Sequence, residues 1–176
     1  MTGTHASPWL RRAAAAVLAV LVAAGGAACG DDGTNAAAAK KIQPLGAEVL
    51  PGEIHGLRVT PEDTAVVKNT EDPFVEAVGL YGLREGELLQ ATLQVSRFTP
   101  KADLKSGRFR NQIVQQIGSS EPKPFRMGES TVYLTTGLRQ SIAVWFRGRT
   151  MMVLSSRQDY DEPRALLRAA LEQVKP

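Results

Sequence analysis

The amino-acid sequence predicts an α+β fold in which a mainly antiparallel sheet of about six strands is covered by two helices. The first observation is an alternation of apolar and polar side chains over 89–96, which is the period of a strand. The second is the spacing of apolar residues over 106–117 and near the C-terminus, which is the period of an amphipathic helix. Both patterns fit a single domain over 45–176.

The first half of this domain contributes three expected strands. Residues 54–59 form the first, and 74–83 and 88–98 form a hairpin around the turn-like segment 84–87. In the second arm of the hairpin the apolar residues alternate with Gln, Thr and Ser. One face of the sheet is therefore expected to pack on a core and the other to meet water.

A helix is expected next, over 106–117. Phe109, Ile113 and Ile117 recur at i, i+4 and i+8 and so line one side of it. Gly118 is a natural terminator for this helix.

Three further strands are expected after a loop over 119–124. They cover 131–135, 140–146 and 150–155. The last two are joined at Arg147-Gly148, where glycine supplies the positive φ of a tight turn.

The C-terminal segment predicts the second helix. Asp161 is the expected N-cap and Pro163 lies in the first turn. One apolar stripe, expected to cover the buried face of the sheet, consists of Leu166, Leu167, Ala170, Leu171 and Val174. The element order is therefore three strands, a helix, three strands and a helix.

The N-terminal 28 residues have the organisation of an export signal. A short segment ending in Arg11-Arg12 precedes an uncharged stretch, Ala13 to Ala28, whose length of about 16 residues falls short of the roughly 20 that a spanning helix needs. The segment Gly30 to Gly33, directly after Cys29, contains two aspartates and so ends the uncharged stretch. The segment Gly26-Ala27-Ala28-Cys29 resembles the lipobox of bacterial lipoproteins, whose cysteine receives a diacylglyceryl group before cleavage, although Gly26 stands where that family usually has Leu.

This resemblance implies three segments and an address. Residues 1–28 would be a signal peptide, 29–44 a lipidated Cys29 with a flexible, disordered tether, and 45–176 the folded domain. Two acyl chains hold a protein stably on a bilayer without a spanning helix, so the domain is expected at the extracytoplasmic face of the cell membrane. The element order over 54–174 is in turn similar to PsbP-like domains, a resemblance that rests on no specific motif and implies no functional residues.

Charge and residue counts exclude several function classes. The chain has 21 Lys and Arg against 18 Asp and Glu, and removal of Arg11 and Arg12 with the signal leaves 19 basic residues. The mature chain is nearly neutral, which is untypical of a nucleic-acid binder. One cysteine and two histidines provide no cluster with zinc spacing, so neither a metal nor a cofactor is expected.

Two groups of residues are candidates for chemistry or binding. His55 is the histidine left after cleavage, so a histidine-based acid-base mechanism has to use it, although a surface position is the simpler interpretation. Trp145, Arg147 and Arg149 lie around the expected hairpin tip, where an aromatic and two cations would form a partner surface unless the alternation buries the aromatic. The acids ahead of the C-terminal helix are explained by helix capping.

The sequence favours a non-enzymatic envelope lipoprotein that binds a protein, lipid or wall component near the membrane. Two alternatives stay open. One is an envelope hydrolase that uses His55 or a carboxylate pair. The other is a lipid-carrying domain, which requires an apolar cavity between the sheet and a helix.

Overall fold

The computed structural model describes residues 40–46, 50–63, 67 and 70–174. In chain order its elements are β1 (Lys40–Lys41), β2 (Gln43–Pro44), β3 (Glu53–Ile54), β4 (Leu57–Pro61), β5 (Glu71–Asp72), β6 (Val75–Glu85), β7 (Leu88–Phe98), α2 (Gly107–Ile117), β8 (Lys123–Met127), β9 (Ser130–Gly137), β10 (Gln140–Arg147), β11 (Thr150–Arg157) and α3 (Pro163–Gln173). The expected signal peptide over 1–28 and Cys29 lie outside the described residues.

One large sheet dominates the described part of the chain. Its strand order is β3-β4-β6-β7-β11-β10-β9-β8 with antiparallel neighbours throughout, and β2 pairs with β6 in parallel, which makes nine strands. β1 and β5 form a separate two-stranded sheet. The α+β class with a mostly antiparallel sheet and two helices is confirmed, but the expected count of about six strands is too low.

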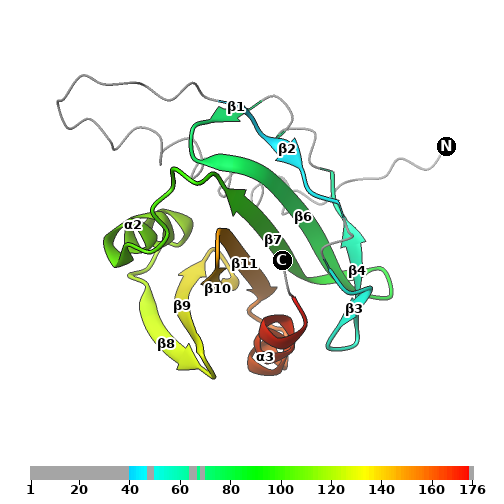
Figure 1. Ribbon diagram of the computed structural model, residues 1–176. Helices are drawn as coiled ribbons and strands as arrows, with labels where there is room; N and C mark the ends of the chain where they lie inside the picture. Colours follow the sequence, from blue (N-terminus) through cyan, green and yellow to red (C-terminus); the bar gives the residue numbers. More distant parts are fainter. Residues whose placement is uncertain (1–39, 47–49, 64–66, 68–69, 175–176) are drawn as a thin grey trace, which may run out of the picture.

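The two helices cover opposite faces of the sheet. Figure 1 shows the sheet curling around α3, with α2 on the outer side. α2 packs on the outer face with Val144 and Val153, whereas α3 packs on the inner face with Trp145 and Met152. Neighbouring residues on one strand thus belong to different cores, because successive side chains point to opposite faces.

The second half of the outer face of β7 is buried, contrary to the expectation that this face meets water, while Gln90 and Thr92 in the first half are half-buried. Gln94 and Ser96 lie on this face and are 6% and 0% exposed. The Gln94 Nε2 donates to Ser96 Oγ at 2.9 Å, so these two polar groups partner each other under the cover of the fold. At this part of β7 the alternation of polar and apolar side chains therefore distinguishes two buried faces of the sheet, and not a buried face from a solvent-exposed one.

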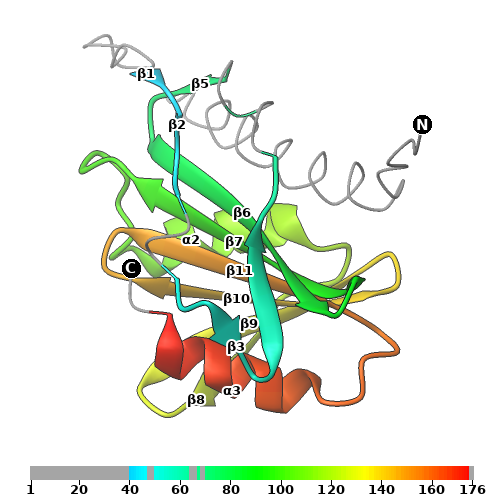
Figure 2. The same ribbon diagram turned by 90° about the vertical axis from the view of Figure 1, so that its right-hand side faces the viewer.

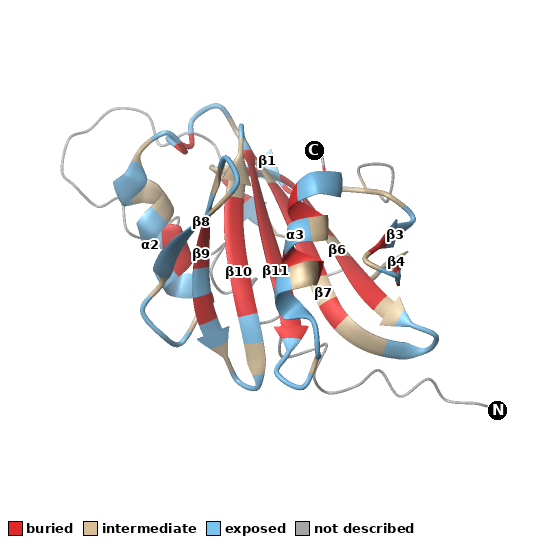
Figure 3. Ribbon diagram, turned by 90° about the horizontal axis from the view of Figure 1, so that it is seen from below, coloured by how far each residue is buried: buried red, intermediate tan, exposed pale blue. Residues whose placement is uncertain are grey.

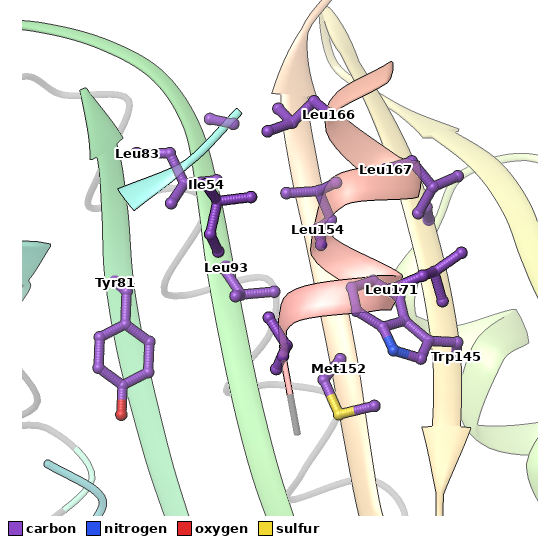
Figure 4. Close-up of a cluster of buried hydrophobic side chains, with 14 of the residues drawn as sticks. Ile54, Tyr81, Leu83, Leu93, Trp145, Met152, Leu154, Leu166, Leu167 and Leu171 are labelled. Atoms are coloured by element: carbon purple, nitrogen blue, oxygen red, sulfur yellow. The ribbon is translucent and has the colours of Figure 1, made fainter. Parts of the chain in front are cut away.

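Side chains fill the space between the sheet and α3. Trp145, Met152 and Leu166 are completely buried there, and Figure 4 shows them converging with side chains from the central strands and the helix. The Tyr81 hydroxyl donates to the Gly46 carbonyl at 2.6 Å and so meets a polar partner at the margin of this core. A lipid-carrying domain needs a cavity in this layer, and the packing of these residues does not favour one.

A tight turn interrupts the expected first strand over 54–59. Ile54 pairs with Leu57, so His55 and Gly56 form a two-residue loop between β3 and β4. Both loop residues have positive φ, 51° and 75°, which suits the right-handed twist of the flanking strands. His55 thus lies at a hairpin tip and not within a strand.

The folded domain begins earlier than the expected boundary at residue 45. Lys40–Lys41 pairs with β5, and Gln43–Pro44 pairs with β6. Ile42 between them is 1% exposed and joins the outer core. The last part of the expected tether is therefore structured, because the sheet provides pairing partners that composition does not reveal.

An additional edge strand, β8, begins at Lys123 near the end of the segment expected to be a loop over 119–124 and continues to Met127. It pairs with β9 around a turn at Gly128, whose φ is 59°. Figure 3 shows β8 exposed along its length, while β10 and β11 are buried at their centres. Pro124 is tolerated because an edge strand has unpaired backbone groups on one side.

Both helices occur where their apolar stripes predict them. Ser106 caps α2 by accepting a hydrogen bond from the Phe109 amide at 3.3 Å. The N-cap of α3 is Glu162, without a side-chain cap bond, so the assignment of that role to Asp161 is wrong by one residue. Pro163 begins the helix, which is the position where its missing amide hydrogen costs least.

Gly118 follows α2 for a steric reason and not for a left-handed turn. Its φ is −111°, which any residue adopts, but a Cβ at this position would overlap the side chain of Thr135. Close approach of the helix end to β9 therefore requires glycine.

We expect Gly118→Ala to lower the free energy of unfolding by about 1–3 kcal/mol, because Thr135 or the helix end has to move. Gly107 at the start of the same helix is the matched control, since a Cβ there meets nothing within 4 Å. Gly107→Ala is expected to change stability by less than about 1 kcal/mol. Urea unfolding of the two variants measures both effects, and equal midpoints would contradict this account.

Candidate functional site

His55 makes a surface hydrogen bond that joins the β3–β4 hairpin to the start of α3. Its Nε2 is 2.7 Å from Glu162 Oε2, and the two side chains are 31% and 62% exposed. An exposed pair of this kind contributes at most about 1 kcal/mol. The contact fixes His55 to a carboxylate and brings no hydroxyl nucleophile to it among the hydrogen bonds of the described residues.

Carboxylates gather around this pair. Burial raises the pKa of the Tyr160 phenol, and the nearby charges of Glu162, Glu85 and Asp161 raise it further. These three acids come from the β6–β7 turn and from the segment before α3, so the fold concentrates negative charge at one end of the sheet. No group of three or more His, Cys, Asp or Glu in the described ranges is placed to hold a metal ion.

Asp159 has a partner of its own in the same region. The Arg157 Nε donates to Asp159 Oδ1 at 2.8 Å. This hydrogen bond lowers the pKa of the Asp159 carboxyl and raises that of the guanidinium. Two of the three acids ahead of α3, Glu162 and Asp159, thus pair with His55 and Arg157, which explains these two without a capping bond.

Trp145 is not part of an exposed surface. Its side chain is 0% exposed within the inner core, and its Nε1 has no hydrogen-bond partner among the described residues. The strand alternation therefore buries this aromatic, as the simpler of the two sequence interpretations states. The β10–β11 tip therefore does not present the Trp145 ring to solvent beside Arg147 and Arg149.

Arg147 binds the C-terminal end of α3. Its guanidinium donates to the Val174 carbonyl at 2.7 Å and to the Leu171 carbonyl at 2.9 Å. The last carbonyls of a helix have no partner within the helix, and a cation there also complements the helix dipole. Arg147 is therefore a structural cap that ties the helix to β10.

Arg149 makes a looser set of contacts on the other side of the hairpin tip. It donates to the Phe98 carbonyl at 3.1 Å and lies 3.5 Å from Glu76 Oε2. Its side chain is 52% exposed. The two arginines thus point into different parts of the fold and do not form a joint surface.

An exposed apolar pair lies instead on the edge hairpin β8–β9. Phe125 is 47% exposed and Leu134 is 39% exposed. Phe125 pairs with Val132 and Leu134 with Lys123, so the two apolar side chains lie on the same face as diagonal neighbours. Arg126 is exposed on the same strand. Arg126 points to the opposite face from Phe125, whereas Lys123, which is also exposed, lies on the same face, so an aromatic and a basic side chain occur together here.

The sequence signal for this surface was present but weak. Phe125 and Met127 alternate with Pro124 and Arg126 ahead of a glycine, which is the pattern of a short strand and a turn. Proline within the segment favours a loop, and this masks the strand.

Comparisons with known proteins add no further evidence. No protein-family model, no curated protein and no solved structure matches the chain. Neither described helix is long and apolar enough to cross a membrane.

We expect Arg147→Ala to lower the free energy of unfolding by about 1–3 kcal/mol, since two helix carbonyls lose a charged donor. Arg149→Ala is the matched control at the same hairpin and is expected to cost less than about 1 kcal/mol. Chemical denaturation of both variants provides the comparison. A larger loss for Arg149→Ala would contradict the role assigned to Arg147.

Proposed function

We propose that the chain is a lipid-anchored lipoprotein of the cell envelope whose domain binds a partner without catalysing a reaction. The observation that carries this proposal is the change at Cys29, where an uncharged stretch with lipobox-like residues gives way to a polar segment. Cys29 precedes the first described strand by eleven residues. A chain of that length spans at most about 40 Å, so an acylated Cys29 would keep the domain near the bilayer.

The contacts of His55 support a non-enzymatic interpretation. A histidine that activates a nucleophile needs a hydroxyl or thiol within hydrogen-bond reach, and the hydrogen bond of the His55 side chain among the described residues goes instead to the Glu162 carboxylate at 2.7 Å. Its position on a two-residue turn links two elements of the fold. The contact between His55 and Glu162 is thus explained by its role in joining the β3–β4 hairpin to α3, without a catalytic role.

The exposed pair Phe125 and Leu134 supports a binding function and locates it. Large apolar side chains that lie together on an edge hairpin, with Lys123 on the same face beside them, have the composition of a protein interface. Pro124 removes a backbone donor from the strand, which disfavours simple strand addition. We propose that an envelope protein docks through side-chain contacts on this face.

The anchor is tested by the intact mass of protein extracted from membranes of the producing cell. The wild-type chain is expected to begin at Cys29 and to carry the added mass of a diacylglyceryl group, and Cys29→Ser is expected to lose both cleavage and that mass. Thr34→Ser is the matched control and should be processed normally. An unmodified Cys29 in the wild-type chain would overturn the anchor.

The binding surface is tested by replacing Phe125 with a photo-crosslinking phenylalanine analogue in living cells. We expect one discrete crosslinked product, which the additional change Leu134→Ser reduces. Leu138 is the matched control, because it is 85% exposed at a different turn. Both positions are exposed, so the replacements should leave the fold intact. Equal crosslinking at 125 and 138 would remove this face from the proposal.

A further inference from the structure

Charged residues are divided between the two ends of the sheet. The first end, here the β1 end, contains β1, the start of β6, the end of β7 and the start of α2. The contact of the Phe74 and Phe109 rings, with centroids 6.0 Å apart, holds the start of α2 against the start of β6. The second end contains the β3–β4 turn, the β6–β7 turn and the segment before α3. Figure 2 shows the strands running between these two ends.

Basic side chains without ion pairs lie at the β1 end. Lys101, Lys105 and Arg108 are all exposed, and none of them forms an ion pair with a described carboxylate. They fall within eight residues, on the turn that leads into α2 and on its first turn. This arrangement places three cations on one solvent-facing surface.

The acids at the same end are mostly engaged. Asp72 is 3% exposed and accepts hydrogen bonds from the Phe74 and Val75 amides. Glu76 is paired with Arg149, and the Asp103 carboxylate accepts from the Ser106 amide. Glu71 lies opposite Lys41 across the β1–β5 pair, and Asp72 lies opposite Lys40. The outward charge at this end is therefore positive.

The opposite end carries the reverse charge. Glu87 at the β6–β7 turn is 99% exposed, and its carboxylate lies 3.8 Å from Arg58, which is 61% exposed. Glu85, Asp161 and Glu162 lie close enough to Tyr160 to raise the pKa of its phenol, in addition to the effect of burial. The domain is thus polarised along the direction of its strands.

We propose that the β1 end docks on the anionic surface of the bilayer and that Lys101, Lys105 and Arg108 contact lipid phosphates. This inference rests on the proposed anchor at Cys29. The chain enters the described domain at Lys40, which belongs to the basic end, so the anchor and the cations act on the same side of the domain. Cations within a Debye length of an anionic surface are attracted to it, while the acidic end is repelled, and together these forces orient the domain.

The test uses lipidated protein extracted from membranes and reconstituted into vesicles. Cys29 is the sole cysteine of the chain, and acylation blocks its thiol, so one introduced cysteine can be labelled specifically. Asn111→Cys places a fluorophore on α2 near the β1 end, and Glu87→Cys places it at the acidic end. A lipid-borne acceptor in the bilayer then reports the proximity of each label by energy transfer.

We expect the label at 111 to transfer more energy in vesicles containing phosphatidylglycerol than in pure phosphatidylcholine. Energy transfer from the label at 87 should be unchanged or lower in the vesicles containing phosphatidylglycerol. About 1 M salt should remove the difference, because the Debye length falls to roughly 3 Å. Each basic residue near an anionic surface shifts binding about fivefold, so K101E/K105E/R108E should abolish the lipid dependence. Circular dichroism and thermal unfolding establish that this variant is folded.

The matched control, R58E/R164E/R168E, has the same net charge but changes exposed residues on β4 and α3, and it should keep the wild-type lipid dependence. If the two triple variants behave alike, or if transfer at 111 is the same in both lipids, the orientation is overturned while the anchor stands. Protein that fails to float with either vesicle type lacks the anchor, which removes the proposed function and this inference together.

Discussion

The structure depends on the burial of both faces of its central strands. Met151 and Met152 are each 0% exposed, yet they belong to different cores because adjacent side chains of a strand point to opposite faces. A sheet of this kind is stable only when each face is covered. α2 and α3 supply the two covers, and the curvature of the sheet around α3 follows from wrapping a twisted layer over one short helix.

Several polar residues help to hold one of these covers, α3, on the sheet. Arg147 satisfies the free carbonyls at the end of α3, and the His55–Glu162 pair joins the start of the helix to a hairpin. The inner cover is therefore held at both ends as well as along its apolar stripe. Residues that look reactive in the sequence hold the helix in place, and the proposed binding surface lies elsewhere, on the edge hairpin.

The sequence was most informative where a pattern continues over many residues. The β6–β7 hairpin and both helices follow from local periodicity, and Ser106 and Pro163 indicate where the helices begin. The short strands β1 and β2 exist only because other parts of the chain pair with them, and a two-residue strand has no period to detect. The contacts of Arg147 join residues 24 and 27 positions apart, so they require the fold before they can be seen.

The geometry of the sheet makes the two proposed surfaces compatible. The cations of the β1 end face along the strand direction, whereas Phe125 and Leu134 lie on the face of an edge hairpin and point across that direction. A domain that rests on the bilayer through the basic end would therefore keep its apolar pair clear of the lipid surface. Orientation by charge would then limit the directions from which an envelope protein reaches Phe125, since the membrane blocks approach from the β1 end.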